Sequence, residues 1–104
     1  MQPEPPPRAL RLDIDGEALA HNWRTLNDLS GKAVAAAAVK ADGYGLGARH
    51  VVPILRDAGC ADFFVAHFGE LADIAGLVDP SRLAVLHGPL NAQDAAYARA
   101  LGAK

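Results

Sequence analysis

The segment AVAAAAVKADGYGLG, residues 33–47, decides how this chain folds. Its first seven residues, 33–39, are all apolar and small or branched, the pattern of a parallel strand that is buried on both faces. Lys40 ends this run, and a turn that contains Gly43, Gly45 and Gly47 follows it. We therefore expect a buried strand over residues 33–39 that places an ammonium group at the mouth of a site.

Strands and helices alternate along the chain after this turn. Apolar patterns predict strands over residues 63–66 and 83–86, and helices over residues 70–77 and 92–101, the last with Asn91 as N-cap. A further helix ends at Gly59, and because proline is comfortable only in a first turn, this helix either starts near His50 or is kinked at Pro53. This alternation indicates right-handed crossover units in a parallel sheet and an α/β fold class.

The segment before residue 33 is predicted to hold a leader, a strand and a helix. Four prolines between Pro3 and Pro7 favour an extended, disordered leader over residues 1–8. Alternating apolar residues predict a strand with one wet face over residues 10–14. Asp15 is a candidate N-cap for a helix that stops at Ser30-Gly31, and its apolar stripe consists of Leu19, Trp23, Leu26 and Leu29.

The length of 104 residues suits only part of a larger architecture. Three core strands cannot close a barrel, and a barrel of eight such units needs about 250 residues. We therefore expect residues 9–104 to be the opening part of a (β/α)8 barrel, truncated here.

Composition excludes several classes of partner. The formal net charge of −2 provides no basic surface for nucleic acid or anionic lipid. The sequence has no secretion signal and no apolar run that approaches the ~20 residues of a membrane span. A single cysteine, Cys60, leaves no disulfide framework and suits a reducing cytoplasm, where we interpret it as a packing residue.

The four histidines show no metal-binding spacing, so no metal site is predicted. His21 and His50 lie on predicted helices and are interpreted as surface residues. His67 and His87 each follow a predicted strand, and each could line the mouth of a barrel.

Three interpretations of Lys40 are open on the residues alone. It could be a solvated lysine at a strand end. It could belong to a phosphate-binding loop, because Gly43, Gly45 and Ala48 match G-x-G-x-x-A, although Asp62 precedes its strand where a ribose-binding acid should follow it. It could also form a Schiff base with an aldehyde such as pyridoxal 5'-phosphate, with Tyr44 beside the cofactor.

Residues 37–47, AAVKADGYGLG, closely resemble the cofactor-attachment motif of the alanine racemases, A-V-V-K-A-[ND]-A-Y-G-H-G. Gly43 stands in place of the motif's alanine and Leu46 in place of its histidine, and neither is the Schiff-base position. The resemblance implies the barrel of a fold-type III enzyme, in which Lys40 attaches pyridoxal 5'-phosphate and the hydroxyl of Tyr44 reaches the phosphate. Asp42 is interpreted as a residue that shapes the turn.

The resemblance also implies a reaction and a setting. The expected enzyme is an isomerase that interconverts L-alanine and D-alanine and supplies D-alanine for the cell wall, as a cytoplasmic homodimer. Lys40 would be the base for one face of the substrate, while the opposing tyrosine would lie outside these 104 residues, so we expect the isolated chain to be inactive. The alternatives are another fold-type III racemase or decarboxylase, and a pyridoxal-phosphate homeostasis protein.

Overall fold

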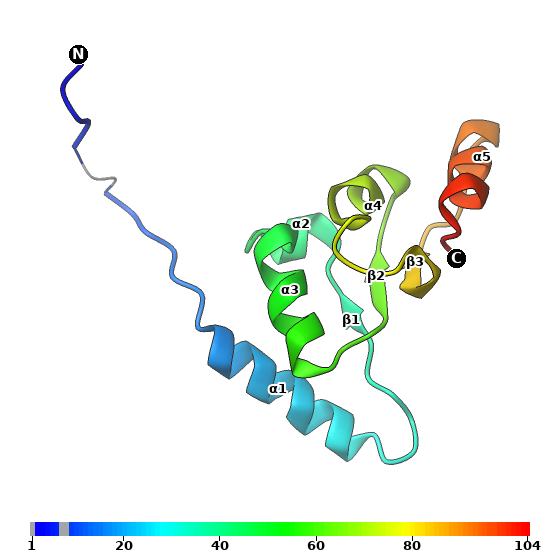
Figure 1. The fold of residues 1–104 in the computed structure, drawn as a ribbon, viewed down its shortest axis with the longest axis horizontal. Helices are drawn as coiled ribbons and strands as arrows, with labels where there is room; N and C mark the ends of the chain where they lie inside the picture. Colours follow the sequence, from blue (N-terminus) through cyan, green and yellow to red (C-terminus); the bar gives the residue numbers. More distant parts are fainter. Residues whose placement is uncertain (1, 7–8) are drawn as a thin grey trace.

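The sheet of this protein has three parallel strands, as seen in a computed structural model that describes residues 2–6 and 9–104. The strands β1 (Ala37–Ala38), β2 (Phe63–Val65) and β3 (Leu83–Val85) lie side by side in chain order (Figure 1). In the register, Ala38 lies beside Phe64, and Phe64 lies beside Ala84. The parallel α/β arrangement predicted from the alternating patterns is thus confirmed.

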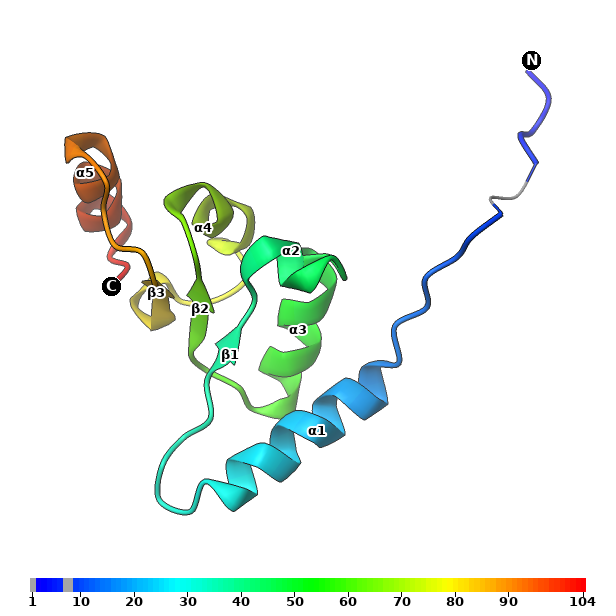
Figure 2. The same ribbon diagram turned by 180° about the vertical axis from the view of Figure 1, so that it is seen from behind.

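Five helices and one short 3-10 turn connect and flank these strands in the described part of the chain (Figures 1 and 2). Their bounds are α1 (Gly16–Leu29), α2 (Lys40–Tyr44), α3 (Ala48–Ala58), α4 (Phe68–Ile74), η1 (Pro80–Arg82) and α5 (Ala92–Leu101).

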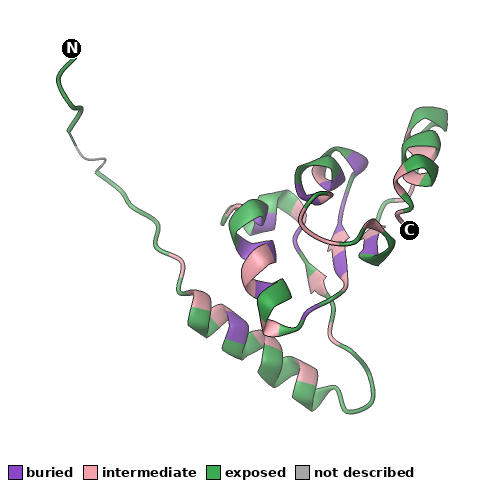
Figure 3. Ribbon diagram, in the orientation of Figure 1, coloured by how far each residue is buried: buried purple, intermediate pink, exposed green. Residues whose placement is uncertain are grey.

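The core lies between the sheet and the pair α3 and α4 (Figure 3). Phe63 and Leu83 contribute fully buried side chains from β2 and β3, and Val52 and Leu71 contribute them from the two helices. Along β2 and β3 the middle residue is less buried than its neighbours, because successive side chains of a strand point to opposite faces. The sheet therefore has one face packed under helices and one face that no described helix covers to the same degree.

Local sequence signals set the bounds of several helices. An oxygen of Asp15 accepts a hydrogen bond of 3.0 Å from the amide of Ala18 at the start of α1, and Asn91 accepts one of 2.8 Å from Asp94 at the start of α5. Gly59 ends α3 in the left-handed region at φ 118°. These bounds confirm the predicted caps.

Pro53 lies inside α3, which begins at Ala48 and so starts two residues before His50. The helix accommodates a residue that donates no amide hydrogen, because its buried face packs into the core through Val51, Val52 and Leu55. Of the two alternatives, a start near His50 agrees with the observed start to within two residues.

The strand predicted over residues 10–14 is not present. This segment has no regular secondary structure, and the side chains of Leu10 and Leu12 are 89% and 65% exposed. A strand is stabilised by ladder bonds to a neighbour, and residues 10–14 pair with none of the three strands of the described sheet. Of the leader predicted over residues 1–8, residues 1, 7 and 8 lie outside the described residues, and residues 2–6 are exposed without regular structure.

The strand predicted over residues 33–39 is shorter and less buried than expected. Only Ala37 and Ala38 pair as a strand, Val34 is 68% exposed, and Val39 alone is fully buried. Double burial requires layers on both faces of a sheet, and the described helices pack on one.

Candidate active site

The carboxyl ends of the three strands meet at one edge of the sheet, because the strands are parallel. Lys40 follows β1 directly after Val39, whose amide donates a hydrogen bond of 2.8 Å to the carbonyl of Phe64. His67 and His87 follow the other two strands, and their rings meet edge to face with centroids 5.1 Å apart. The structure thus brings His67 and His87 together, whereas His21 and His50 are exposed on α1 and α3 as expected.

The segment after Lys40 is one turn of left-handed helix. Ala41 and Asp42 have φ values of 53° and 54°, and Gly43 and Tyr44 continue in the same region at 66° and 57°. Only glycine adopts this conformation freely, and the conformation costs other residues about 1–2 kcal/mol each. Three of these four residues are not glycine, so contacts elsewhere must hold the turn in place.

Hydrogen bonds within the turn supply part of that stabilisation. The amide of Gly43 donates to the carbonyl of Val39 at 2.9 Å, and Oδ1 of Asp42 accepts a hydrogen bond of 2.8 Å from the amide of Ala48, the first residue of α3. Asp42 therefore joins the turn to the next helix, which agrees with its interpretation as a turn-shaping residue.

At Gly43 and Gly47 in this segment, a side chain would crowd neighbouring atoms. A Cβ atom on Gly43 would lie 3.2 Å from the amide nitrogen of Ala48, and one on Gly47 would lie 2.8 Å from the ring of His50. The chain therefore uses glycine where the turn presses against the start of α3.

Glu70 supplies the remaining support from outside the turn. Its Oε2 accepts a hydrogen bond from the amide of Ala41, the residue after Lys40, although the two are 29 positions apart. Its Oε1 accepts from the amides of Ala66 and His67 at 2.9 and 3.1 Å. Partial burial opposes ionisation of this carboxyl, but the three amide donors outweigh it and hold the pKa of Glu70 below its usual range.

Sequence reasoning did not assign Glu70 a role. The available signal was its position three residues after His67, the N-cap of α4. A glutamate at this position commonly accepts a hydrogen bond from the backbone amide of the N-cap residue. No local pattern indicated that its second oxygen reaches the turn of Lys40.

The two predicted site residues stand at opposite ends of this turn. Lys40 is partly buried and opens it, while Tyr44 closes it with 62% of its surface exposed. A primary amine and a phenol are thus presented from one backbone unit at the carboxyl edge of the sheet. The amine can form a covalent bond with an aldehyde, and the phenol can donate a hydrogen bond to an anion.

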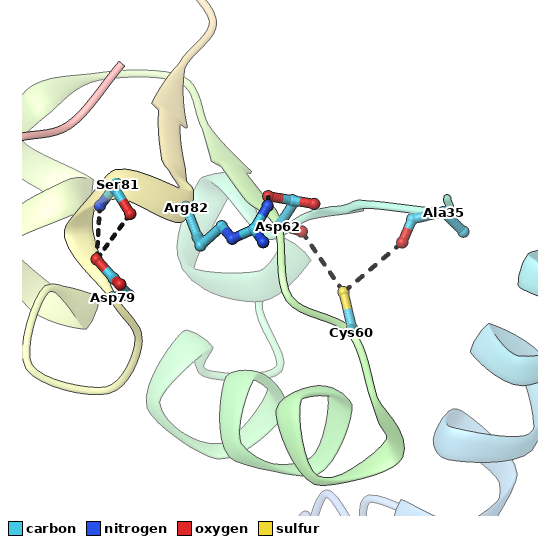
Figure 4. Close-up of polar contacts among 6 residues, drawn as sticks. All are labelled: Ala35, Cys60, Asp62, Asp79, Ser81 and Arg82. Carbon is cyan, nitrogen blue, oxygen red and sulfur yellow. Dashed lines mark hydrogen bonds and ion pairs between the residues drawn. The ribbon is translucent and has the colours of Figure 1, made fainter. Parts of the chain in front are cut away.

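Cys60 is a packing residue on the evidence of its surroundings (Figure 4). It is 1% exposed, and Sγ lies 3.5 Å from the carbonyl of Asp62 and 4.0 Å from that of Ala35. Burial raises the pKa of this thiol, which disfavours the nucleophilic thiolate. The thiol is therefore unsuited to catalysis.

One ion pair and one hydrogen-bonded turn lie at the amino ends of the strands (Figure 4). Arg82 lies 3.2 Å from Asp62, and Asp79 accepts hydrogen bonds from the amide and hydroxyl of Ser81 at 3.0 and 2.8 Å. These Ser81 donors lower the pKa of Asp79. The contacts shape η1 and the loop before β2, at the edge opposite Lys40.

Two kinds of feature are missing from residues 2–6 and 9–104. No three His, Cys, Asp or Glu side chains there are grouped closely enough to hold a metal ion. Within the same described ranges, no helix has the length and apolar character needed to cross a bilayer.

Comparison with known proteins places this geometry in context. The chain is 54% identical to the alanine racemase of Rhizobium meliloti (strain 1021) over 78 residues, which cover 75% of this chain and 21% of that protein. It is 45% identical to the alanine racemase of Methylobacterium nodulans over 92 residues, which cover 88% of this chain and 25% of that one. The chain thus spans about a quarter of the length of these relatives.

A solved structure with a bound cofactor shows the same fold. The structure is similar, with a TM-score of 0.75 and 35% identity, to the crystal structure of alanine racemase from Bartonella henselae with covalently bound pyridoxal phosphate; the match covers 84% of this chain and 24% of that one. The three parallel strands and their helices agree with the first units of a (β/α)8 barrel. Because residues 14–103 also match the family model for the N-terminal domain of alanine racemase, this chain belongs to the alanine racemase family.

Proposed function

We propose that this chain forms the cofactor-anchoring part of an alanine racemase, a pyridoxal-phosphate-dependent isomerase that interconverts L-alanine and D-alanine. The observation that carries the proposal is the position of Lys40, a partly buried residue at the carboxyl end of β1 and at the start of a left-handed turn. The carboxyl ends of barrel strands are where barrel enzymes place their chemistry. The covalently bound pyridoxal phosphate in the similar Bartonella henselae structure supports this interpretation of Lys40.

The residues present fit pyridoxal phosphate. Nζ of Lys40 would be the attachment atom and the hydroxyl of Tyr44 would bind the phosphate, while the space beside Gly45 is open, because a Cβ there would meet no atom within 4 Å. When bound, the cofactor supplies an electron sink for the pair left on the substrate carbon after loss of its α-proton.

Lys40 then has a second task, which is to hold and move a proton. Racemisation removes a proton from one face of the substrate and returns it to the other, so a base is needed on each face. We assign Nζ of Lys40 to one face, and we assign the opposite face to a group outside residues 1–104. The isolated chain should therefore capture the cofactor without racemising alanine.

We extend the proposal to domain organisation and biology on the strength of the family. Residues 9–104 form the N-terminal part of the barrel domain, and residues 1–8 are a leader. The complete enzyme acts as a cytoplasmic homodimer and provides D-alanine for the cell wall.

The test uses the three lysines of the chain, Lys32, Lys40 and Lys104, as internal references. The purified chain is mixed with pyridoxal phosphate and reduced with borohydride, and the label is mapped by peptide mass analysis. We expect label mainly on Lys40, loss of it in Lys40→Ala, and retention in the control Lys32→Ala, whose lysine is exposed.

Two results would contradict the proposal. Equal labelling of all three lysines would remove Lys40 as the anchor. Alanine racemisation by the isolated chain above the rate of free cofactor would show that the second base lies within residues 1–104.

A further inference from the structure

Glu70 connects two strand ends through its two carboxylate oxygens. Oε1 accepts hydrogen bonds from the amides of Ala66 and His67 at the start of α4, at 2.9 and 3.1 Å. Oε2 accepts from the amide of Ala41 at the end of β1. Capping α4 requires only the first oxygen, so the second is available to the turn that carries Lys40.

The bond to Ala41 constrains Lys40 through the planar peptide group. The amide of Ala41 and the carbonyl of Lys40 belong to the same peptide unit, which is rigid. A hydrogen bond that holds this N–H therefore restrains the peptide plane on the carboxyl side of the Cα atom of Lys40, while the bond from the amide of Gly43 to the carbonyl of Val39 restrains the plane on its amino side. Together the two bonds restrain the direction of the Cα–Cβ bond of Lys40. Ala41 is also the first residue of the turn in the left-handed region, at φ 53°. The hydrogen bond from Glu70 therefore acts at the residue where the backbone enters that region.

A carboxylate is the chemical group that this position requires. Three amide donors converge on Glu70, and an ionised carboxylate offers acceptor sites on both oxygens. A glutamine has the same shape, but one of its two polar atoms is an NH₂ donor. If its oxygen keeps the cap of α4, its nitrogen faces the N–H of Ala41 and the link to the turn is lost.

We propose that Glu70 is a positioning residue that orients Lys40 for attachment of pyridoxal phosphate. Its carboxylate oxygens are engaged by backbone amides, so in this role it acts through the peptide that joins Lys40 to Ala41. This inference rests on the proposed role of Lys40 as the anchor. It adds a residue from α4 to the machinery of that site.

The experiment compares Glu70→Gln with two matched controls in the 104-residue chain. Glu17→Gln makes the same change of charge at an exposed glutamate in the first turn of α1, and Asn91→Ala removes the cap of a different helix. Amide hydrogen exchange at Ala41 is followed by NMR. Pyridoxal phosphate is then trapped with borohydride, and the ratio of label on Lys40 to label on Lys32 is measured together with the circular dichroism of the trapped chromophore.

We expect faster exchange at Ala41 in Glu70→Gln and a fall in the labelling ratio of about three- to tenfold, the range for one hydrogen bond to a partly exposed acceptor. The dichroism per bound chromophore should fall with the ratio. Both controls should keep the exchange rate and the ratio of the unsubstituted chain. Because Glu70→Gln could lose stability, Glu70→Asp serves as a second variant: it keeps the charge beside α4 but is one methylene too short to bridge both strand ends.

The outcomes separate this inference from the proposed function. Unchanged exchange at Ala41, or faster exchange with an unchanged labelling ratio, would overturn the positioning role while Lys40 stays the anchor. An equal fall of the ratio in Asn91→Ala would overturn it too, because general loosening would then explain the effect. A ratio near one in the unsubstituted chain would refute the anchor itself, and the positioning role with it.

Discussion

Replacing Asp42 by alanine tests how the left-handed turn is held. Oδ1 of Asp42 accepts a hydrogen bond of 2.8 Å from the first amide of α3, and Asp42 itself lies in the left-handed region at φ 54°. Loss of an acceptor at a helix start costs about 1 kcal/mol. Alanine tolerates the left-handed region less well than aspartate does, which adds about 0.5–1 kcal/mol. Asp42→Ala should therefore lower the free energy of unfolding by about 1.5–2 kcal/mol.

The matched control is Asp42→Asn. Asparagine keeps an oxygen acceptor at the same place and adopts the left-handed region readily, so its cost should stay below about 0.5 kcal/mol. The racemase motif that residues 37–47 resemble accepts either residue at this position, in line with that expectation.

Urea unfolding followed by far-ultraviolet circular dichroism measures both variants. With a slope of about 1.5–2 kcal/mol/M, the midpoint of Asp42→Ala should fall by about 1 M and that of Asp42→Asn by no more than about 0.3 M. A midpoint of Asp42→Ala equal to that of the unsubstituted chain would refute the role of this side chain. Equal losses in both variants would show that the negative charge matters, and not the acceptor geometry.

Three further predictions follow from burial and from the shifted pKa values. Phe63→Ala should cost about 3–5 kcal/mol in urea unfolding because Phe63 is fully buried, whereas Phe64→Ala, on the less covered face, should cost clearly less; equal costs would contradict the one-sided core. The pKa of Glu70 is lowered in the fold, so its stabilising effect is complete above the ordinary glutamate pKa of about 4.3 and is lost as the pH falls through the lower folded value. The stability difference between the unsubstituted chain and Glu70→Gln, measured by urea unfolding, should therefore shrink on acidification, and a constant difference would argue against the shift. Cys60 should react with a thiol reagent only as fast as the chain opens, since it is buried and its pKa is raised, and rapid reaction in the folded chain would show that it is accessible.

Local patterns were sufficient for the elements whose bonding partners are near in sequence. Asp15 and Asn91 cap helices whose amides lie three residues away, and Gly59 ends α3 through its own backbone conformation. The order of strands and helices followed from apolar periodicity, which is also a local property of the sequence, although the strands pair with partners 20 or more residues away. The prediction failed for residues 10–14, where alternation without a partner strand leaves the segment unpaired.

The sequence by itself determined the position of Lys40 at the end of a strand and before a glycine-containing turn, because the apolar run, the lysine and the glycines are contiguous in the chain. Only the tertiary structure decided the hand of that turn, the meeting of His67 with His87, and the bond from Glu70 to Ala41. The physical reason is distance along the chain. The amide of Ala41 finds its acceptor 29 residues away, and that pairing exists only once parallel strands have brought their carboxyl ends to one edge.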